Sequence, residues 1–103
     1  MKSRSQIKMN FAKARADADK IDRIAATMKT LSRRNLENSM NELAAAWTGN
    51  NSRLFLKKEG QLQRDIDQTV RSLNDIAADI RRIAQRVYEA EMRAYEIATR
   101  RNS

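Results

Sequence analysis

The chain has 103 residues, of which 33% are charged, and a mean hydropathy of −0.79. These values predict one soluble domain over residues 1–103, and they exclude both a membrane span and a thick apolar core. Cysteine and histidine are absent, which excludes a disulfide framework, a thiolate nucleophile and the commonest acid–base and metal ligand. We therefore expect no enzymatic activity, no cofactor and no metal site.

The start of the chain is basic, and Met1–Lys8 leads into no apolar stretch of the kind found in a signal peptide. Export by the general secretory route is therefore not expected. Polar and apolar residues alternate from Gln6 to Asn10, which predicts a short lead-in with Asn10 as the N-cap of a helix.

The first helix is expected over residues 10–46, because no proline or glycine interrupts it and apolar residues recur at steps of three and four. The pattern shifts phase once, at Ser32–Asn35, and the same steps resume beyond it. We interpret this as one helix with a drifting apolar stripe rather than two helices joined by a loop. The apolar positions are Phe11, Ala14, Ala18, Ile21, Ile24 or Ala25, Met28 and Leu31, followed by Leu36, Met40, Leu43 and Trp47.

A tight turn is expected over residues 47–51. Trp47 closes the first helix, Gly49 can adopt a positive φ, and the polar residues that follow can cap the next helix. Leu54 and Phe55 come directly afterwards, and we expect them to pack at the same end of the hairpin beneath Trp47.

The second helix, expected over residues 52–100, shows the stronger periodicity. Its apolar residues keep alternating steps of four and three, which is a heptad pattern, and a second set widens the stripe to the width that a helical bundle needs. Gly60 is the weak point and costs roughly 1 kcal/mol relative to alanine unless a close helix crossing uses its small size. The heptad positions are Leu62, Ile66, Thr69, Leu73, Ile76, Ile80, Ile83, Val87, Ala90, Ala94 and Ile97, and the widening positions are Val70, Ala77, Ala84, Glu91 and Ala98.

A single hairpin would leave much of this wide stripe in water. The burial that remains cannot easily offset a backbone entropy of roughly 1 to 2 kcal/mol per ordered residue. The predicted fold class is therefore all-α: a helix-turn-helix hairpin of two long antiparallel helices that pairs into a four-helix bundle dimer.

The central motif resembles that of the WXG family of small type VII secretion proteins. Trp47-x-Gly49 is followed by Ser52 and Phe55 in the arrangement W-x-G-x-x-[small]-x-x-F, at the middle of about a hundred residues of predicted helix. The resemblance spans the chain. It implies a helical hairpin that pairs into an antiparallel four-helix bundle and is exported folded by a membrane ATPase complex.

The resemblance also implies a secretion signal near the C-terminus. Its narrow form, Tyr-x-x-x-Asp/Glu, is not met, since Met92 follows Tyr88 by four residues and Thr99 follows Tyr95 by four. The broader form, hydrophobic-x-x-x-Asp/Glu-x-x-hydrophobic-x-x-x-hydrophobic, is met on one helix face. Two interpretations of its acid stay open here: a secretion signal, or a charge that flanks the apolar stripe. The matching residues are Val87, Glu91, Ala94 and Ala98.

The formal net charge of +8 is the feature that the resemblance does not explain. Basic pairs such as Arg33-Arg34, Lys57-Lys58 and Arg81-Arg82 could neutralise phosphates, so a basic helical nucleic-acid-binding protein is the alternative function. Acids are interleaved along the chain and break any continuous basic face, and we therefore favour an acidic protein partner over nucleic acid. The candidates are a second copy of the chain, another small helical protein, the type VII export ATPase and a larger helical toxin as cargo.

Overall fold

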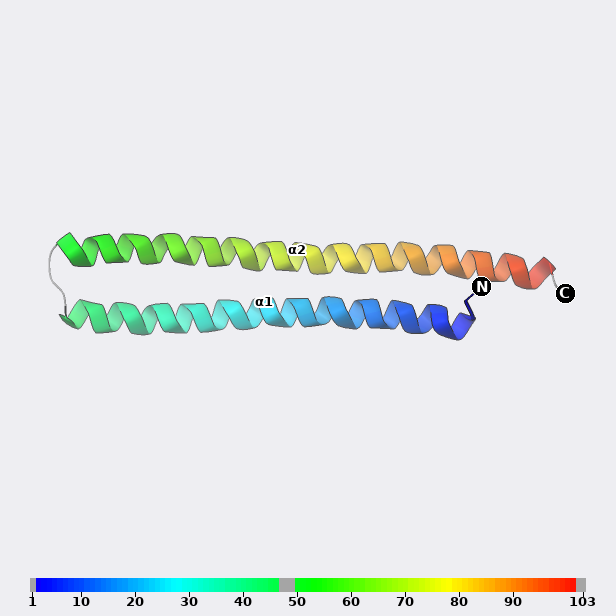
Figure 1. Cartoon of the computed structure of the whole chain (residues 1–103), viewed down its shortest axis with the longest axis horizontal. Helices are drawn as coiled ribbons and strands as arrows, with labels where there is room; N and C mark the ends of the chain where they lie inside the picture. The colour runs from blue at the N-terminus through cyan, green and yellow to red at the C-terminus, as the bar shows by residue number, and fades with distance from the viewer. Residues whose placement is uncertain (1, 47–49, 102–103) are drawn as a thin grey trace. The chain divides into compact units, whose positions relative to one another are not determined.

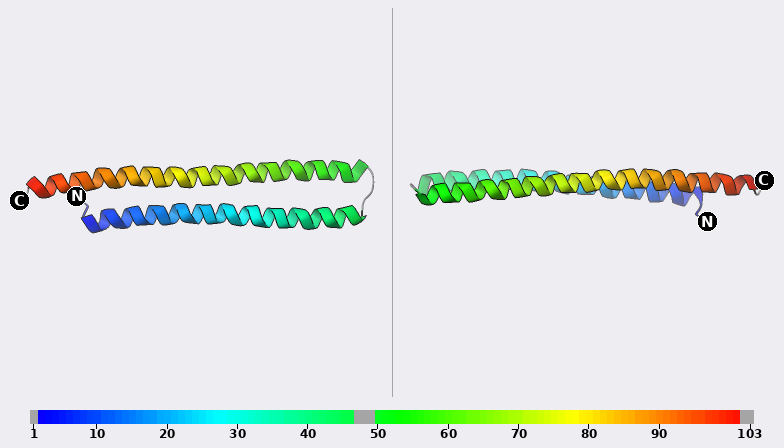
Figure 2. Two further views of the ribbon diagram at one scale, coloured as in Figure 1. Left: turned by 180° about the vertical axis from the view of Figure 1, so that it is seen from behind. Right: turned by 90° about the horizontal axis from the view of Figure 1, so that it is seen from above.

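The chain forms two long antiparallel helices in a computed structural model. α1 spans Arg4–Ala46 and α2 spans Asn50–Arg101, and the two run side by side in opposite directions (Figures 1 and 2). The structure describes the backbone of residues 2–46 and 50–101 and the side chains of residues 2–42 and 53–101. The predicted all-α hairpin is confirmed.

Contacts divide the chain into two compact units. The terminal unit comprises Met1–Asp22 and Asp75–Ser103, and the central unit comprises Arg23–Asn74. Each unit therefore contains one stretch of α1 and one stretch of α2.

α1 begins six residues earlier than the sequence pattern indicated, so the predicted N-cap at Asn10 is wrong. The backbone N–H of Gln6 donates to Ser3 Oγ (3.1 Å), and the N–H of Ser3 donates to Gln6 Oε1 (3.0 Å). This reciprocal pair is a capping box, which satisfies two backbone donors that would otherwise lack partners. It starts the helix at Arg4 and places Ile7 within the first turns, where that side chain is buried.

The phase shift at Ser32–Asn35 does not break α1, which confirms the prediction of one continuous helix. Ser32 is half-buried in the central unit, and its hydroxyl donates to the carbonyl oxygen of Lys29 at 3.2 Å. The next half-buried residue is Leu36 rather than Asn35. The half-buried residues on both sides of Ser32 are therefore spaced by four. This spacing moves the apolar stripe around the helix while the backbone stays helical.

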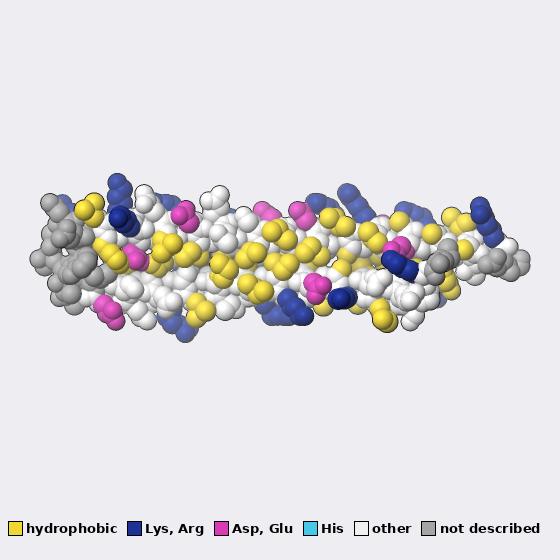
Figure 3. Space-filling view, in the orientation of Figure 1, with side chains coloured by type: hydrophobic (Ala, Val, Ile, Leu, Met, Phe, Trp, Pro, Cys, Tyr) yellow, Lys and Arg dark blue, Asp and Glu magenta, His cyan; other side chains and the backbone are white. Residues whose placement is uncertain are grey.

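Small residues are the most completely buried where α1 and α2 meet. In the terminal unit Ala18 and Ala77 have no exposed surface, and in the central unit the same holds for Ala25. Short side chains allow two helix axes to approach closely. Figure 3 shows hydrophobic side chains gathered along the line where α1 and α2 meet. We call such a row the inner seam of its unit; its buried members are Ile7, Ala18 and Ala77 in the terminal unit and Ala25 and Val70 in the central unit.

In the terminal unit, most of the larger aliphatic residues of α2 lie beside the inner seam and remain exposed, while Ile80 is half-buried. Ile83 is 55% exposed and Ile97 is 52% exposed, whereas Ala77 of the widening set is fully buried. The heptad positions of the sequence are therefore mostly not the residues that pack against α1. In the terminal unit they form a second row, the outer seam, made of Ile76, Ile80, Ile83, Val87, Ala90, Ala94 and Ile97.

Ion pairs occupy the other edge of the inner seam in the terminal unit. The guanidinium of Arg81 donates from Nη2 to Asp19 Oδ1 (2.7 Å) and to Asp22 Oδ2 (2.6 Å). The hydrogen bond to Asp19, then the one to Asp22, raises the pKa of Arg81 above its usual value. On the α2 helix, Arg81 and Ile83 point to opposite sides of Ala77. One edge is thus closed by charge, and the other remains apolar and open.

Gly60 of α2 lies in ordinary helical surroundings. A Cβ atom built there would meet Arg64 Nη1 at 3.7 Å, which is ordinary van der Waals contact with the end of a flexible side chain. Among the described residues, no atom of α1 lies within 4 Å of that Cβ position, so the glycine lowers helix stability without a compensating contact from them.

We expect Gly60→Ala to stabilise the protein by about 0.5–1 kcal/mol, because alanine loses less conformational entropy in a helix. Urea unfolding followed by circular dichroism measures the change. Gln61→Ala, at the exposed neighbouring residue, is the matched control and should shift the midpoint much less. A lower midpoint for Gly60→Ala would mean that the space at residue 60 is needed.

Candidate functional site

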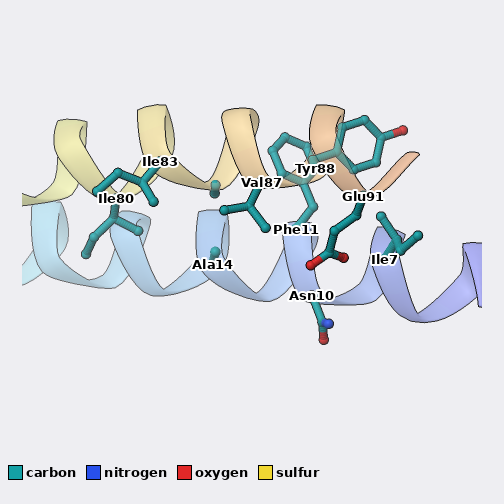
Figure 4. A pocket seen from close by; sticks show the side chains of 10 residues that line it. Ile7, Asn10, Phe11, Ala14, Ile80, Ile83, Val87, Tyr88 and Glu91 are labelled. Carbon is teal, nitrogen blue, oxygen red and sulfur yellow. The ribbon is translucent and has the colours of Figure 1, made fainter. Parts of the chain in front are cut away.

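An apolar groove of about 290 Å³ lies in the terminal unit beside the outer seam. Side chains of α1 and α2 form its two walls (Figure 4). It is open to solvent, and most of its lining is aliphatic or aromatic. Such a surface suits a packed side chain or helix rather than bond-making chemistry. The lining residues are Ile7, Asn10, Phe11 and Ala14 of α1 and Ile80, Ile83, Ala84, Val87, Tyr88 and Glu91 of α2.

An aromatic stack joins the two helices at this groove. The rings of Phe11 and Tyr88 lie 4.7 Å apart between centroids with an interplanar angle of 29°. The guanidinium carbon of Arg15 lies 5.7 Å from the centre of the Phe11 ring, within the range of a cation–π contact. Stacked pairs contribute about 0.5–1.5 kcal/mol beyond their burial. The stack therefore holds α1 and α2 together where the groove opens.

Glu91 is the acidic residue of the groove. Its carboxylate points toward α1 (Figure 4), and Oε1 accepts a hydrogen bond from Lys2 Nζ at 2.9 Å. The Glu91 side chain is 25% exposed and that of Lys2 is 52% exposed. The Glu91 carboxylate is therefore not on an exposed flank: it occupies an inner-seam position opposite the first residues of α1. A partly exposed pair of this kind contributes at most about 1 kcal/mol.

The four residues of the broad signal pattern lie in two different surroundings. Val87 and Glu91 line the groove. Because Lys2 reaches Glu91, Ala94 and Ala98 lie on the part of α2 that extends past the start of α1 (Figure 1). Ala94 is exposed and Ala98 is half-buried. The groove and this C-terminal extension thus meet at Glu91.

The other predicted site residues belong to the middle of the chain. Trp47 and Gly49 lie outside the residues that the structure describes. Leu54 is 60% exposed and Phe55 is half-buried, so Leu54 has little packing within the chain. Their role at the hairpin end stays a prediction.

Sequence reasoning missed the contribution of α1 to the groove. Lys2 belongs to the stretch described only as a basic start, Asn10 was expected to be an N-cap, and Phe11 was counted as the first apolar position of the helix. The Ser3-x-x-Gln6 spacing is the signal that could have corrected this, because it places a helix start before Ile7.

The sequence matches the family model WXG100, described as proteins of 100 residues with WXG, over residues 6–92. The chain belongs to the WXG100 family. The resemblance seen in the sequence is thereby confirmed. No curated protein and no solved structure matches the chain. WXG100 proteins are non-enzymatic secreted substrates, and this member is accordingly not an enzyme.

The matched region of this WXG100 protein contains the groove and stops at Met92. It therefore includes Val87 and Glu91, whereas Ala94 and Ala98 lie beyond it. Within residues 2–46 and 50–101, no helix is long and apolar enough to cross a membrane.

Proposed function

We propose that this WXG100 protein is a type VII secretion substrate that is exported folded, as a dimer joined along the outer seam. Family membership supports the secretion route, since WXG100 proteins are secreted by type VII systems and typically dimerise. The observation that best supports a dimer is the exposure of the apolar outer seam. Residues 1–103 would act as one domain, with Trp47 and Gly49 forming its turn.

The energetic case for pairing rests on the aliphatic residues of the outer seam. Ile76, Ile83, Val87 and Ile97 are each about half exposed. Complete burial of such a side chain contributes roughly 1.5–3 kcal/mol, so covering their exposed halves in two chains would yield several kcal/mol. Each α2 would then pack on α1 through the inner seam and on a second chain through the outer seam, as in a four-helix bundle.

The signal would be read where the groove and the extension of α2 meet. Beyond Glu91, α2 extends past the start of α1 (Figure 1), so a receptor could approach Ala94 and Ala98 directly. A basic residue of that receptor could replace Lys2 as the partner of Glu91. If a second, larger protein is the cargo, this chain would act as its secretion partner through the same surface.

The exposed charges favour a protein partner over nucleic acid. Arg81 bonds two carboxylates, and Arg82 Nη2 lies 2.8 Å from Asp79 Oδ1. Both members of this basic pair are thus engaged with acids of the same chain. A phosphate backbone would have to compete with those bonds, which weakens the electrostatic term on which nonspecific nucleic-acid binding depends.

We expect the protein to reach the culture medium only when the type VII export ATPase is present, and Glu91→Gln to reduce that export. The amide keeps the shape of the side chain and removes the charge, and loss of one partly exposed ion pair should leave helicity unchanged. The measurement is immunodetection in medium and lysate of the native host at equal expression, with and without the ATPase gene.

Two variants separate a signal from a structural effect. Lys2→Gln breaks the same ion pair but keeps the carboxylate, so it should be exported like the parent. Glu89→Gln removes a charge from an exposed residue of α2 and should also be exported normally. Export that persists without the ATPase would refute type VII secretion. Normal export of Glu91→Gln would mean that the signal lies elsewhere, on this chain or on its partner.

A further inference from the structure

A second groove, of about 440 Å³, is lined by α1 and α2 in the central unit. Its lining includes three carboxylates and one guanidinium, so the groove is acidic in a chain whose formal net charge is +8. Part of the lining is apolar and open to solvent, since Met40 is 41% exposed and Leu56 is 44% exposed. Such a groove suits a cation that carries an apolar stem. Its charged members are Arg33, Glu37, Glu59 and Asp67.

Two side-chain oxygens at this groove are buried without a hydrogen-bond partner among the described residues. They are Glu59 Oε2 and Gln63 Oε1, and their residues lie about one turn apart on α2. Gln63 Nε2 donates to Asp67 Oδ1 at 3.0 Å, so the amide nitrogen is engaged while the carbonyl oxygen is not. Buried acceptors are normally paired, because an unpaired one loses its bonds to water on folding and gains nothing in return. The groove therefore holds two acceptors in place for an external donor.

We propose that this groove binds an arginine side chain of a partner protein, whose guanidinium donates to Glu59 Oε2 and Gln63 Oε1 while its methylene stem packs on Met40 and Leu56. A guanidinium carries five N–H donors in a planar fork, so it can serve acceptors on successive helical turns at the same time. Its bond to the Glu59 carboxylate would be charge-assisted. A lysine ammonium is a compact point charge and matches such a pair of acceptors less well.

The sign of the groove favours a protein over other macromolecules. Its three carboxylates would repel the phosphates of nucleic acid and of anionic lipids. Arginine side chains, by contrast, are frequent anchors of protein–protein interfaces.

The groove is also separate from the heptad positions of α2. In the central unit, Asp67 lies on one side of the buried Val70, and the heptad residues Leu62 and Leu73 lie on the other. Pairing through heptad positions would leave the groove open. The inference therefore concerns a further partner and does not depend on the dimer of the proposed function.

An NMR titration of the full, isotope-labelled chain with Nα-acetyl-arginine amide tests the proposal. This probe carries the stem and the guanidinium but has no free amino or carboxyl group. We expect saturable shifts of the Gln63 side-chain amide signals, with a dissociation constant on the order of 1–10 mM, as suits a single side chain. The lysine analogue should bind several-fold more weakly, and the uncharged citrulline analogue should cause no saturable shift.

Two variants test the position of the site. Glu59→Gln keeps the length of the side chain and removes its charge, so we expect binding to weaken about tenfold or more. Asp65→Asn is the matched control, because it removes one negative charge from an exposed residue of α2 that does not line the groove. It should bind the probe like the parent protein. Spectra recorded without the probe show whether each variant keeps the parent fold.

Three results would overturn the proposal. Absence of saturable shifts in the parent protein would refute the site itself. Equal weakening by Glu59→Gln and Asp65→Asn would assign the binding to the general charge of α2 rather than to the groove. Equal affinity for the arginine probe and for guanidinium ion alone would exclude the contact of the stem with Met40 and Leu56. None of these results bears on the dimer, which sedimentation equilibrium measures separately.

Discussion

Ala77→Asp should unfold the terminal unit. Ala77 has no exposed surface and lies in the inner seam, where Ala18 of α1 is also fully buried. An aspartate there would have neither space nor a hydrogen-bonding partner, and burying an unpaired charge costs more than about 3 kcal/mol. We expect loss of most of the helical circular dichroism signal, or a much lower denaturation midpoint, relative to the parent protein.

The adjacent residue provides the control for this experiment. Ala78 is also an alanine of α2, but it is exposed, so Ala78→Asp changes composition and helix propensity equally without burying the charge. It should melt close to the parent. Equal destabilisation by the two substitutions would contradict the assignment of Ala77 to the inner seam, because only burial distinguishes the two residues.

Ile83→Asp should separate pairing from folding. Ile83 is 55% exposed in the single chain, so the hairpin loses little when it becomes polar. In the proposed dimer, however, each copy would bury a carboxylate against the apolar surface of the other. We expect dimerisation to weaken by more than about a hundredfold while most of the helicity of the single chain remains. Sedimentation equilibrium and circular dichroism measure the two effects independently.

Met9→Asp is the corresponding control, since Met9 is 65% exposed and lies on the side of α1 that faces away from the inner seam. It should leave the association constant unchanged. If Ile83→Asp abolished helicity together with the dimer, the single hairpin would not be stable by itself and folding would be coupled to pairing. A dimer unaffected by Ile83→Asp would remove the outer seam as the interface.

Periodicity was sufficient to predict the helices, but not which apolar residues pack within the chain. The heptad pattern is most obvious at large side chains such as Ile76 and Ile83, yet these are about half exposed. Ala77, which merely widened the stripe in the sequence, is buried instead. The apolar stripe of α2 is wide enough to contain two seams, an inner one that packs on α1 and an outer one that remains exposed. The alanines are the fully buried residues, as expected where two helix backbones approach closely.

The candidate site was predicted less completely than the fold, because it depends on how α1 is aligned along α2. The pairing of Lys2 with Glu91 joins residues 89 positions apart, and no local pattern specifies such an alignment. The stack of Phe11 on Tyr88 likewise joins residues that are far apart in the sequence. The start of α1 was misplaced for a different reason, since alternation from Gln6 to Asn10 hid the capping box at Ser3.

The position of Lys2 beside Glu91 has a practical consequence for studying export. An affinity tag or reporter enzyme joined ahead of Lys2 would be tethered next to the carboxylate that a receptor is proposed to read. Steric crowding there would mimic a defective signal even in the unmodified sequence. A short epitope that replaces exposed residues of α1 in the central unit, such as Thr30 and Arg34, would allow detection without obstructing that surface.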